Sequence, residues 1–399
     1  MKPLSALCLL AVDCVNKTAP VVDGPTPYKM IRTTNVKRGF IDIETVHYVS
    51  ETTYEKWTRR SRPQFGDVIL TREAPVGEVG RCTFSDSEQI FLGQRLFQYR
   101  PDPELLDWNY LAFALQSPQV QNKLHGMSFG ATVPHIKVGD AETLEVPCPP
   151  LETQRAIGGT LAAYDDLIEV NRRRIALLEE SARLLYREWF VNLRVPGSPA
   201  LSGAKGPPEG WRTTLLAEMA EINQASLGRK SKLDEIQYVD IASVDTGIVR
   251  GATKMSYADA PGRARRLVRH GDVIWSCVRP NRRSYALMWE PHDDLVVSTG
   301  FAVLTASSVP FSYLYFATTS DGFVAYLTNR ATGAAYPAVT SKDFEEAPLL
   351  CPSPQVLQDF HERCLPMLEL NNNLLQQNAR LMKARDALLP KLMSGEIQV

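Results

Sequence analysis

Residues 149–194 form a heptad segment that constrains the fold of this chain more than any other stretch. Core-compatible residues recur there at alternating steps of four and three, the spacing of a coiled-coil helix. They are Ile157, Leu161, Tyr164, Ile168, Asn171, Ile175, Leu178, Ala182, Leu185 and Trp189. Charged residues such as Asp165, Asp166 and Arg187 lie between them, so we expect a solvated outer face. A helix of about 40 residues is roughly 60 Å long, too long for the core of one small domain, and therefore needs a partner.

The C-terminal segment supplies a candidate partner helix. From Pro366 it reads PMLELNNNLLQQNARLMKARDALLPKLMSGEIQV, and its core positions continue at Asn371, Leu375, Asn378, Met382, Arg385 and Leu389. A shift of 200 residues places Asn171 over Asn371, and buried amides at such positions fix the register of a coiled coil. Pro366 should start or kink this helix. We predict two long antiparallel coiled-coil helices; the alternative is two unrelated amphipathic helices.

Two other regions of the chain resemble each other at a nearly constant offset, which indicates a tandem duplication. Four motifs match in order: YKMIRTTNV with YVDIASVDT, PQFGDVIL with VRHGDVIW, WNYLAFALQS with FSYLYFATTS, and GATVPHIKVGD with GAAYPAVTSKD. GDVI predicts a turn into a short strand, and WNYLAFAL predicts a short helix. Each copy is therefore expected to be a mixed α+β domain, and the whole a pseudo-two-fold tandem repeat.

These patterns divide the chain into five predicted parts. A first globular domain spans 1–148, a long helix 149–194, a Pro/Gly/Ser-rich linker 195–210, a second globular domain 211–350, and a C-terminal helix region 351–399. With 44% hydrophobic residues and a formal net charge of −1, the chain has the composition of an ordinary folded protein. The apolar N-terminal run is read as the first helix or strand of a cytoplasmic domain rather than a secretion signal.

Motifs for covalent chemistry are missing from the sequence. It has no GxxxxGK[ST], GxGxxG after a strand, HExxH or GxSxG. The six histidines are scattered, and the seven cysteines form no CxxC pair, so a zinc site is not expected and the thiols should be reduced. We predict a protein that binds rather than catalyses, with no catalytic residue and no metal site.

Basic residues cluster although the total charge balances. Between Arg229 and Arg283 there are twelve Lys or Arg against six Asp or Glu, a local excess of six. Basic residues also precede GDVI in both copies, as a surface for phosphates requires. The candidates are Arg32, Lys37, Arg38, Arg59, Arg60, Arg62, Arg263, Arg265, Arg266, Arg279, Arg282 and Arg283. The alternative is an ordinary solvated face.

The paired glycine loops SFGATVPHI and RATGAAYPAV add four more candidates for nucleic-acid contact. Thr132, His135, Thr332 and Tyr336 could reach base edges or phosphates from loops whose small residues permit close approach. The alternative is a plain structural turn locked by proline.

The outer face and aromatic end of the first long helix are candidates for partner binding. These residues are Arg172, Arg173, Glu180, Tyr186, Trp189 and Phe190. The alternative is that the aromatic residues pack onto the chain's own globular domains.

Two helices of heptad character, each after a divergent globular domain, with EVNRRRIALLEE, YREWFV and a terminal LMSGE, resemble the specificity subunit of type I restriction-modification enzymes. The resemblance covers essentially the whole chain. It implies two target recognition domains that each read half of a split double-stranded DNA site, and helices that dock two methyltransferase (modification) subunits. Restriction (motor/nuclease) subunits would complete the complex. S-adenosylmethionine, ATP and magnesium would be held by those partners, not by this chain.

Two other classes remain open at this point. A coiled-coil scaffold without DNA reading would explain the helices but not basic clusters that recur in both copies. A type IIG-like enzyme would need a catalytic domain for which this length and motif set leave no room.

Overall fold

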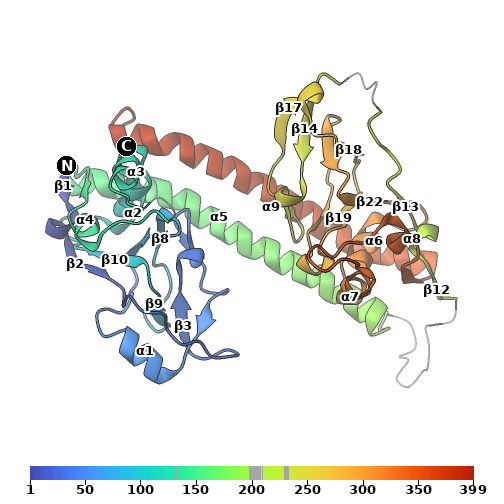
Figure 1. Cartoon of the computed structure of the whole chain (residues 1–399), viewed down its shortest axis with the longest axis horizontal. Helices are drawn as coiled ribbons and strands as arrows, with labels where there is room; N and C mark the ends of the chain where they lie inside the picture. Colours follow the sequence, from blue (N-terminus) through green and yellow to red (C-terminus); the bar gives the residue numbers. More distant parts are fainter. Residues whose placement is uncertain (131–132, 197–207, 209, 229–232) are drawn as a thin grey trace. The chain divides into compact units, whose positions relative to one another are not determined.

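The computed structural model describes all residues except 131–132, 197–207, 209 and 229–232. The chain forms two compact units (Figure 1). The first unit comprises Met1–Arg172 with Gln376–Val399, and the second comprises Arg173–Leu375. Each unit therefore contains one globular region and a stretch of both long helices. Most of the predicted linker, 197–207 and 209, lies outside the described residues.

The first unit is built on two sheets. The larger one has the strand order β2-β10-β7-β8 and is antiparallel throughout. The smaller one has the order β6-β3-β9, with β3 and β9 parallel. The bounds are β1 Lys2–Pro3, β2 Cys8–Asp13, β3 Tyr28–Ile31, β4 Val36–Lys37, β5 Phe40–Ile41, β6 His47–Tyr48, α1 Glu51–Trp57, β7 Val68–Arg72, β8 Val76–Arg81, β9 Gln89–Leu92, β10 Leu96–Pro101, α2 Trp108–Gln116, α3 Pro118–Gly126, α4 Val138–Glu142 and β11 Glu145–Val146.

The second unit repeats this topology. Its larger sheet runs β13-β22-β19-β20 and its smaller one β17-β14-β21-β18, with β14 and β21 parallel. The bounds are β12 Arg212–Leu215, β13 Ala220–Ile222, β14 Glu235–Val239, β15 Val244–Asp245, β16 Ile248–Val249, β17 Thr253–Ser256, β18 Ala264–Leu267, β19 Val273–Ser276, β20 Tyr285–Leu287, β21 Leu295–Ser298, β22 Phe301–Ala306, α6 Phe311–Thr318, α7 Asp321–Arg330, α8 Ser341–Glu345 and β23 Pro348–Cys351. The duplication expected from the sequence is confirmed.

The repeated motifs lie at the same places in both units. Each GDVI motif is a turn followed by the central strand of the larger sheet, β7 or β19, and Gly66 and Gly271 take φ of +86° and +85° there. These strands are buried along nearly their whole length, which explains their continuous apolar sequence. The predicted helix WNYLAFAL is α2, capped by the Asp107 side chain, which accepts a hydrogen bond from the Tyr110 N–H.

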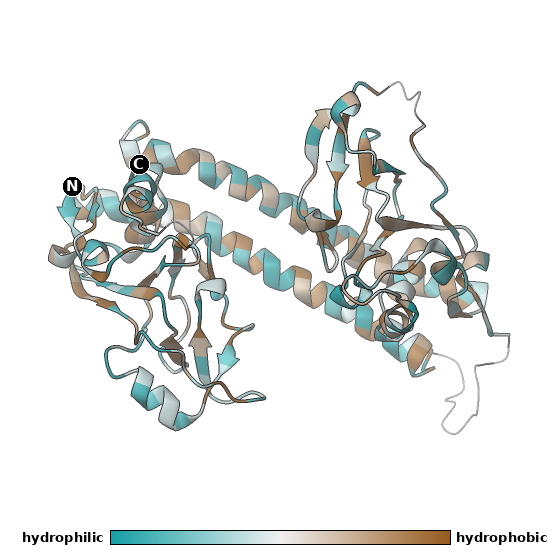
Figure 2. Ribbon diagram, viewed as in Figure 1, coloured by the Kyte–Doolittle hydropathy of each residue, from teal (hydrophilic) through white to brown (hydrophobic). Residues whose placement is uncertain are grey.

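Both long helices are present: α5 spans Leu151–Tyr186, followed by a π-helical turn Arg187–Val191, and α9 spans Pro354–Ser394. Every predicted core position of α5 is buried or half-buried, so the heptad prediction is confirmed. Figure 2 shows hydrophilic and hydrophobic residues alternating along both helices. The second helix starts within the predicted region 351–399, before Pro366. The helix begins at Pro354 and continues through Pro366, whose side chain is exposed and therefore displaces no core contact.

Within the first unit the two helices pair antiparallel, because Asn171 lies opposite Asn378 and Asp165 lies opposite Arg385. Asn171 bonds to Gln377 and Asn378, whereas Asn371 is half-buried. The expectation that Asp165 is solvated is wrong. It is fully buried, and the guanidinium groups of Arg81 and Arg385 both pair with its carboxylate.

The predicted apolar N-terminal run forms β2, as expected for a first strand of a folded domain. Among the described residues, none of the helices combines the length and the apolar character needed to cross a membrane.

Candidate nucleic-acid interface

Two loops meet at the C-terminal end of β7 in the first unit. The turn after β7, residues 73–75, forms a bridge to the glycine loop, which is described at residues 129–130 and 133–137, and Glu73 pairs there with His135. The Arg72 guanidinium adds a hydrogen bond to the Ile136 carbonyl at 2.8 Å. Phe129 and His135 close the glycine loop through two main-chain hydrogen bonds of 2.8 and 2.9 Å. We call this pair of loops the first tip.

The second unit carries the same construction at the end of β19. Residues 277–284 lie beside residues 331–338, and Val278 bridges to Ala338. Thr332 and Ala338 close the glycine loop through a reciprocal pair of main-chain hydrogen bonds, both 2.9 Å. The Arg279 N–H donates to the Pro337 carbonyl at 2.7 Å. We call this pair of loops the second tip.

Glycine is required at one position of each tip. Gly130 has φ of +102° and Gly333 has φ of +106°, in a region that other residues rarely adopt. A Cβ at Gly130 would lie 2.7 Å from the Val133 carbonyl oxygen, and one at Gly333 would lie 3.1 Å from that of Tyr336. The glycines therefore have the structural role of fixing a turn, which was the alternative considered for these loops. The exposed side chains of the loops remain available for contacts with another molecule.

The side chains on the two tips differ in chemistry. On the first tip, Phe129 and Val133 are 48% and 44% exposed, and the Lys137 ammonium lies 4.4 Å from the Phe129 ring centroid. On the second tip, Tyr336 is 70% exposed and the Arg279 guanidinium stacks on its ring at 4.6 Å. The first tip thus presents apolar side chains and one lysine, and the second tip presents an aromatic ring with arginines.

The second tip is tethered by an ion pair. The Arg283 guanidinium contacts the Asp321 carboxylate at 2.5 Å, which joins the turn η7 (Pro280–Arg282) to the first turn of α7. This hydrogen bond from Arg283 holds the pKa of the Asp321 carboxyl below its ordinary value. Arg279 and Arg283 both have left-handed backbone conformations, with φ of +52° and +56°, so the connection between β19 and β20 is sharply bent.

Six predicted site residues meet at the tips. His135 lies on the first, and Arg279, Arg282, Arg283, Thr332 and Tyr336 lie on the second. Thr132 lies outside the described residues. Phe129, Val133 and Lys137 were missed as candidates, although Phe129 and Val133 stand inside the glycine motif and apolar residues in such a loop were the available signal.

The other basic candidates of the first unit lie elsewhere. Lys37 ends β4 and Arg38 begins the turn to β5; both are exposed, and Arg32 precedes β4. Arg60 pairs with Asp13, Arg62 stacks on the Tyr54 ring at 5.3 Å, and Arg59 is exposed. The segment 59–62 precedes β7, whereas the first tip follows it, so the structure does not bring these arginines to the tip.

The corresponding arginines of the second unit lie on or beside β18, an edge strand of the smaller sheet. The Arg263 Nε donates to the Tyr238 hydroxyl at 3.0 Å, and Arg265 bonds to the Tyr257 hydroxyl at 3.0 Å. Burial lowers the pKa of Arg266, whose Nε is buried without a hydrogen-bond partner among the described residues. Of the wider basic cluster, Arg229, Lys230 and Lys232 lie outside the described residues.

The aromatic end of α5 does not form an outer face, which corrects that part of the predicted partner surface. Trp189 and Phe190 are 3% and 5% exposed and pack in the core of the second unit, where both rings contact Phe360. Tyr186 packs against Phe190 and Tyr313, and burial raises its pKa. These side chains are enclosed by their own unit because apolar rings gain most from leaving water.

The charged members of the predicted partner surface keep their exposure. Arg172, Arg173 and Glu180 are all exposed on α5, and the Arg172 guanidinium lies 4.5 Å from the Phe40 ring centroid. In the part of the chain that the structure describes, no group of three or more His, Cys, Asp or Glu residues could hold a metal ion.

Comparison with known proteins shows similarity to one family. Residues 19–180 match the model of the type I restriction modification DNA specificity domain. The chain is 22% identical over 343 residues to the specificity subunit of the type I restriction enzyme MjaIX of Methanocaldococcus jannaschii, covering 84% of this chain and 78% of that protein. It is 21% identical over 405 residues to the HindI specificity subunit of Haemophilus influenzae, covering 83% and 86%. The chain is thus similar over most of its length to type I specificity subunits, and residues 19–180 match their DNA specificity domain.

The fold agrees with this assignment. A crystal structure of the type I restriction-modification system S subunit from M. genitalium superposes with a TM-score of 0.60 at 16% identity, covering 98% of this chain and 95% of the other. In this chain the matched residues 19–180 contain the first tip, and the second tip is its counterpart in the second copy.

Proposed function

We propose that this chain is a type I specificity subunit that binds double-stranded DNA at a bipartite, asymmetric site, with each unit reading one half through its tip. The observation that supports the proposal is that the two units share a backbone fold but expose different side chains. The strand order, the left-handed glycine and the bridge between the loops recur in both units, while the exposed side chains differ. A shared frame with different surface groups lets one fold carry two sequence preferences.

The tip side chains suit base-edge contacts. Arginine can bond to the O6 and N7 atoms of guanine, and apolar groups can contact the methyl group of thymine. Arg282 and Arg279, whose guanidinium stacks on the Tyr336 ring, would serve the first kind of contact on the second tip, and Phe129 and Val133 the second kind on the first tip. The remaining exposed arginines, Arg59 among them, would meet phosphates, which position the protein without reading sequence.

Catalysis belongs to partner subunits in this proposal, and the chain is a non-catalytic recognition subunit in the cytoplasm. Two methyltransferase subunits would dock on the charged face of the long helices, which includes Arg172, Arg173 and Glu180, and restriction subunits would join them. S-adenosylmethionine, ATP and magnesium would be bound by those partners.

The test is methylation mapping of cells that carry single-tip variants. Phe129→Ala should relax the preference in one half of a split motif, and Tyr336→Ala in the other, while the gap stays fixed. Each variant is the control for the other. A continuous palindromic motif, or two variants that alter the same half, would exclude the proposal.

Gel shift of the purified chain separates DNA reading from a scaffold role. The chain, alone and with a modification subunit, is titrated with duplex DNA at low and high salt. Binding by either form supports DNA recognition, and a lack of binding by both would favour the coiled-coil scaffold.

A further inference from the structure

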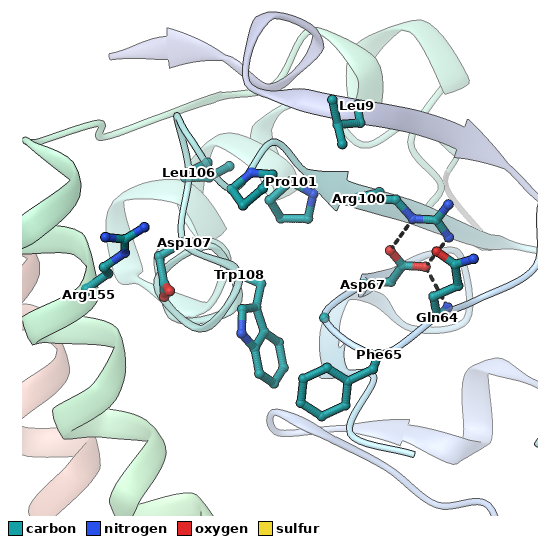
Figure 3. A pocket seen from close by; sticks show the side chains of 12 residues that line it. Leu9, Gln64, Phe65, Asp67, Arg100, Pro101, Leu106, Asp107, Trp108 and Arg155 are labelled. Carbon is teal, nitrogen blue, oxygen red and sulfur yellow. Dashed lines mark hydrogen bonds and ion pairs between the residues drawn. The ribbon is translucent and has the colours of Figure 1, made fainter. Parts of the chain in front are cut away.

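A pocket of about 360 Å³ opens in the first unit between β2, β10, the turn before β7 and the start of α2 (Figure 3). The volume is at the lower end of the range for small-ligand sites, and it suits one large side chain. Phe65 and Trp108 face each other in it, with ring centroids 5.1 Å apart. Leu9 and Phe65 are 65% and 58% exposed, so the pocket and its border present a cluster of uncovered apolar surface.

The second unit shows what covers the same position there. His270 and Phe311 stand where Phe65 and Trp108 stand in the first unit, and the indole of Trp289 packs on both, at 4.7 and 6.0 Å between ring centroids. Trp289 follows Met288, whose carbonyl accepts from the Gly271 N–H. In the second unit this place is therefore filled by an aromatic ring of the chain itself.

The first unit lacks that ring. Cys82 is the counterpart of Met288, because its carbonyl accepts from the Gly66 N–H, and the next residue is the exposed Thr83. A threonine cannot reach across the two rings as an indole does. The side chain that follows this carbonyl is therefore much smaller in the first unit than in the second.

One basic side chain at the border of the pocket is available to an anionic group. The Asp67 carboxylate already accepts two hydrogen bonds from Arg100, both 2.8 Å, and Asp107 caps the Tyr110 N–H at 2.8 Å. Arg155 on α5 is exposed, and within the described ranges it has no hydrogen bond or ion pair. The two acidic and two basic side chains of the lining balance in formal charge, and Arg155 is left available to pair with an added carboxylate.

The pocket lies away from the proposed DNA contacts of the first tip. Asp67 stands just before β7 and the tip just after it, so the five-residue strand, about 16 Å long, separates them.

We propose that this pocket docks a partner protein that inserts an aromatic side chain flanked by a carboxylate. The ring would stack on Phe65 and Trp108 as Trp289 stacks on its two neighbours, and the carboxylate would pair with Arg155. Because the second unit fills its own counterpart, each chain offers this site once. The inference does not depend on DNA recognition.

The test uses the full chain labelled with 5-fluorotryptophan. Each of the six tryptophans of the chain then gives its own ¹⁹F NMR resonance. The Trp108 resonance is assigned with Trp108→Phe. The probe is the peptide acetyl-Glu-Phe-Glu-amide, compared with acetyl-Lys-Phe-Lys-amide and acetyl-Glu-Ala-Glu-amide. We expect a saturable shift of the Trp108 resonance with the first peptide only, while the Trp289 resonance stays unchanged.

Three variants sharpen the result. Thr83→Trp places an indole where the second unit has Trp289 and should abolish peptide binding, and Thr83→Ala is the matched control that keeps it. Arg155→Glu should weaken binding at least tenfold. The other tryptophan resonances verify folding, and Thr83→Trp should leave DNA affinity unchanged.

The proposal is overturned if the Trp108 resonance does not respond, if the lysine peptide binds as well, or if a folded Thr83→Trp variant still binds. Tighter binding of free indole than of the acidic peptide would assign the pocket to a small molecule instead.

Discussion

The side-chain amide of Asn171 donates a hydrogen bond to the side-chain oxygen of Asn378 over 3.0 Å, and both residues are buried between α5 and α9. Asn378 in turn donates to the Ile168 carbonyl at 3.3 Å. The Oδ1 atom of Asn171 is buried without a partner among the described residues. Burying this pair costs free energy, and it selects the one register in which the two amides meet.

Asn171→Leu should lower the free energy of unfolding by about 1–3 kcal/mol, because it leaves the Asn378 amide buried with fewer partners. The double variant with Asn378→Leu should recover much of that loss, since two apolar side chains need no partner. Thermal unfolding of the full chain measures both, with the exposed Asn373→Leu as control. A double variant less stable than Asn171→Leu alone would contradict the register role.

Trp189→Ala should destabilise the second unit by about 3–5 kcal/mol, because it removes a buried ring from the core. Glu180→Ala, on the exposed face of the same helix, should stay within about 0.5 kcal/mol. Denaturant unfolding and co-purification with a modification subunit are measured together. If the Trp189→Ala variant no longer co-purified with the modification subunit but unfolded at the same denaturant concentration as the parent, the Trp189 ring would be part of a subunit interface.

Local periodicity was enough to predict the long helices, because the spacing of Ile157, Leu161 and their successors is written in neighbouring residues. Local periodicity failed at Asp165, because the partner that allows its carboxylate to be buried is Arg81 at the end of β8, 84 positions earlier in the sequence. The tips divide in the same way. Gly130 and Gly333 indicated the turns from the local sequence alone. The distance between Arg59 and the first tip depends instead on strand pairing between residues far apart in the sequence, which a short sequence segment does not reveal.

Asp321→Asn should weaken DNA binding up to about fivefold by releasing the second tip from α7, the range expected for an exposed ion pair of at most about 1 kcal/mol. The lowered pKa of Asp321 fixes the sign of the pH effect. The tether stabilises the tip above the ordinary carboxyl pKa and is lost as pH falls through the lower folded value. The protection of residues 277–284 against hydrogen exchange, corrected for the pH dependence of the intrinsic rate, should therefore fall at acid pH in the parent and not in the variant. Tighter binding by the variant would show that Asp321 competes with DNA for Arg283.

Replacing Arg263 and Arg265 with Gln should weaken binding to all sequences alike. Two lost phosphate contacts would reduce the slope of log affinity against log salt by about 1.8. Arg266 is left in place because its Nε is buried. Arg380→Gln, on the exposed face of α9, is the control. An unchanged slope in the double variant would show that Arg263 and Arg265 do not contact phosphates and are ordinary solvated surface residues.

Adding one heptad after Ile175 and another after Leu375 tests whether helix length sets the gap between half-sites. Both insertions keep the core positions in phase and lengthen each helix by about 10 Å, or roughly three base pairs at 3.4 Å each. Methylation mapping should show unchanged half-sites with a gap longer by about that amount. A folded, active variant with the parental gap would assign the spacing to another feature.

The first unit is discontinuous in sequence, and this gives the chain an order of synthesis. Its core includes Leu392 beside residues such as Leu161, and Arg385 neutralises the buried Asp165. The ribosome must therefore release residues 376–399 before the N-terminal unit can bury its last surfaces, although domains usually fold in the order in which they emerge. A stop codon within the last two dozen positions would damage the part of the protein that is made first.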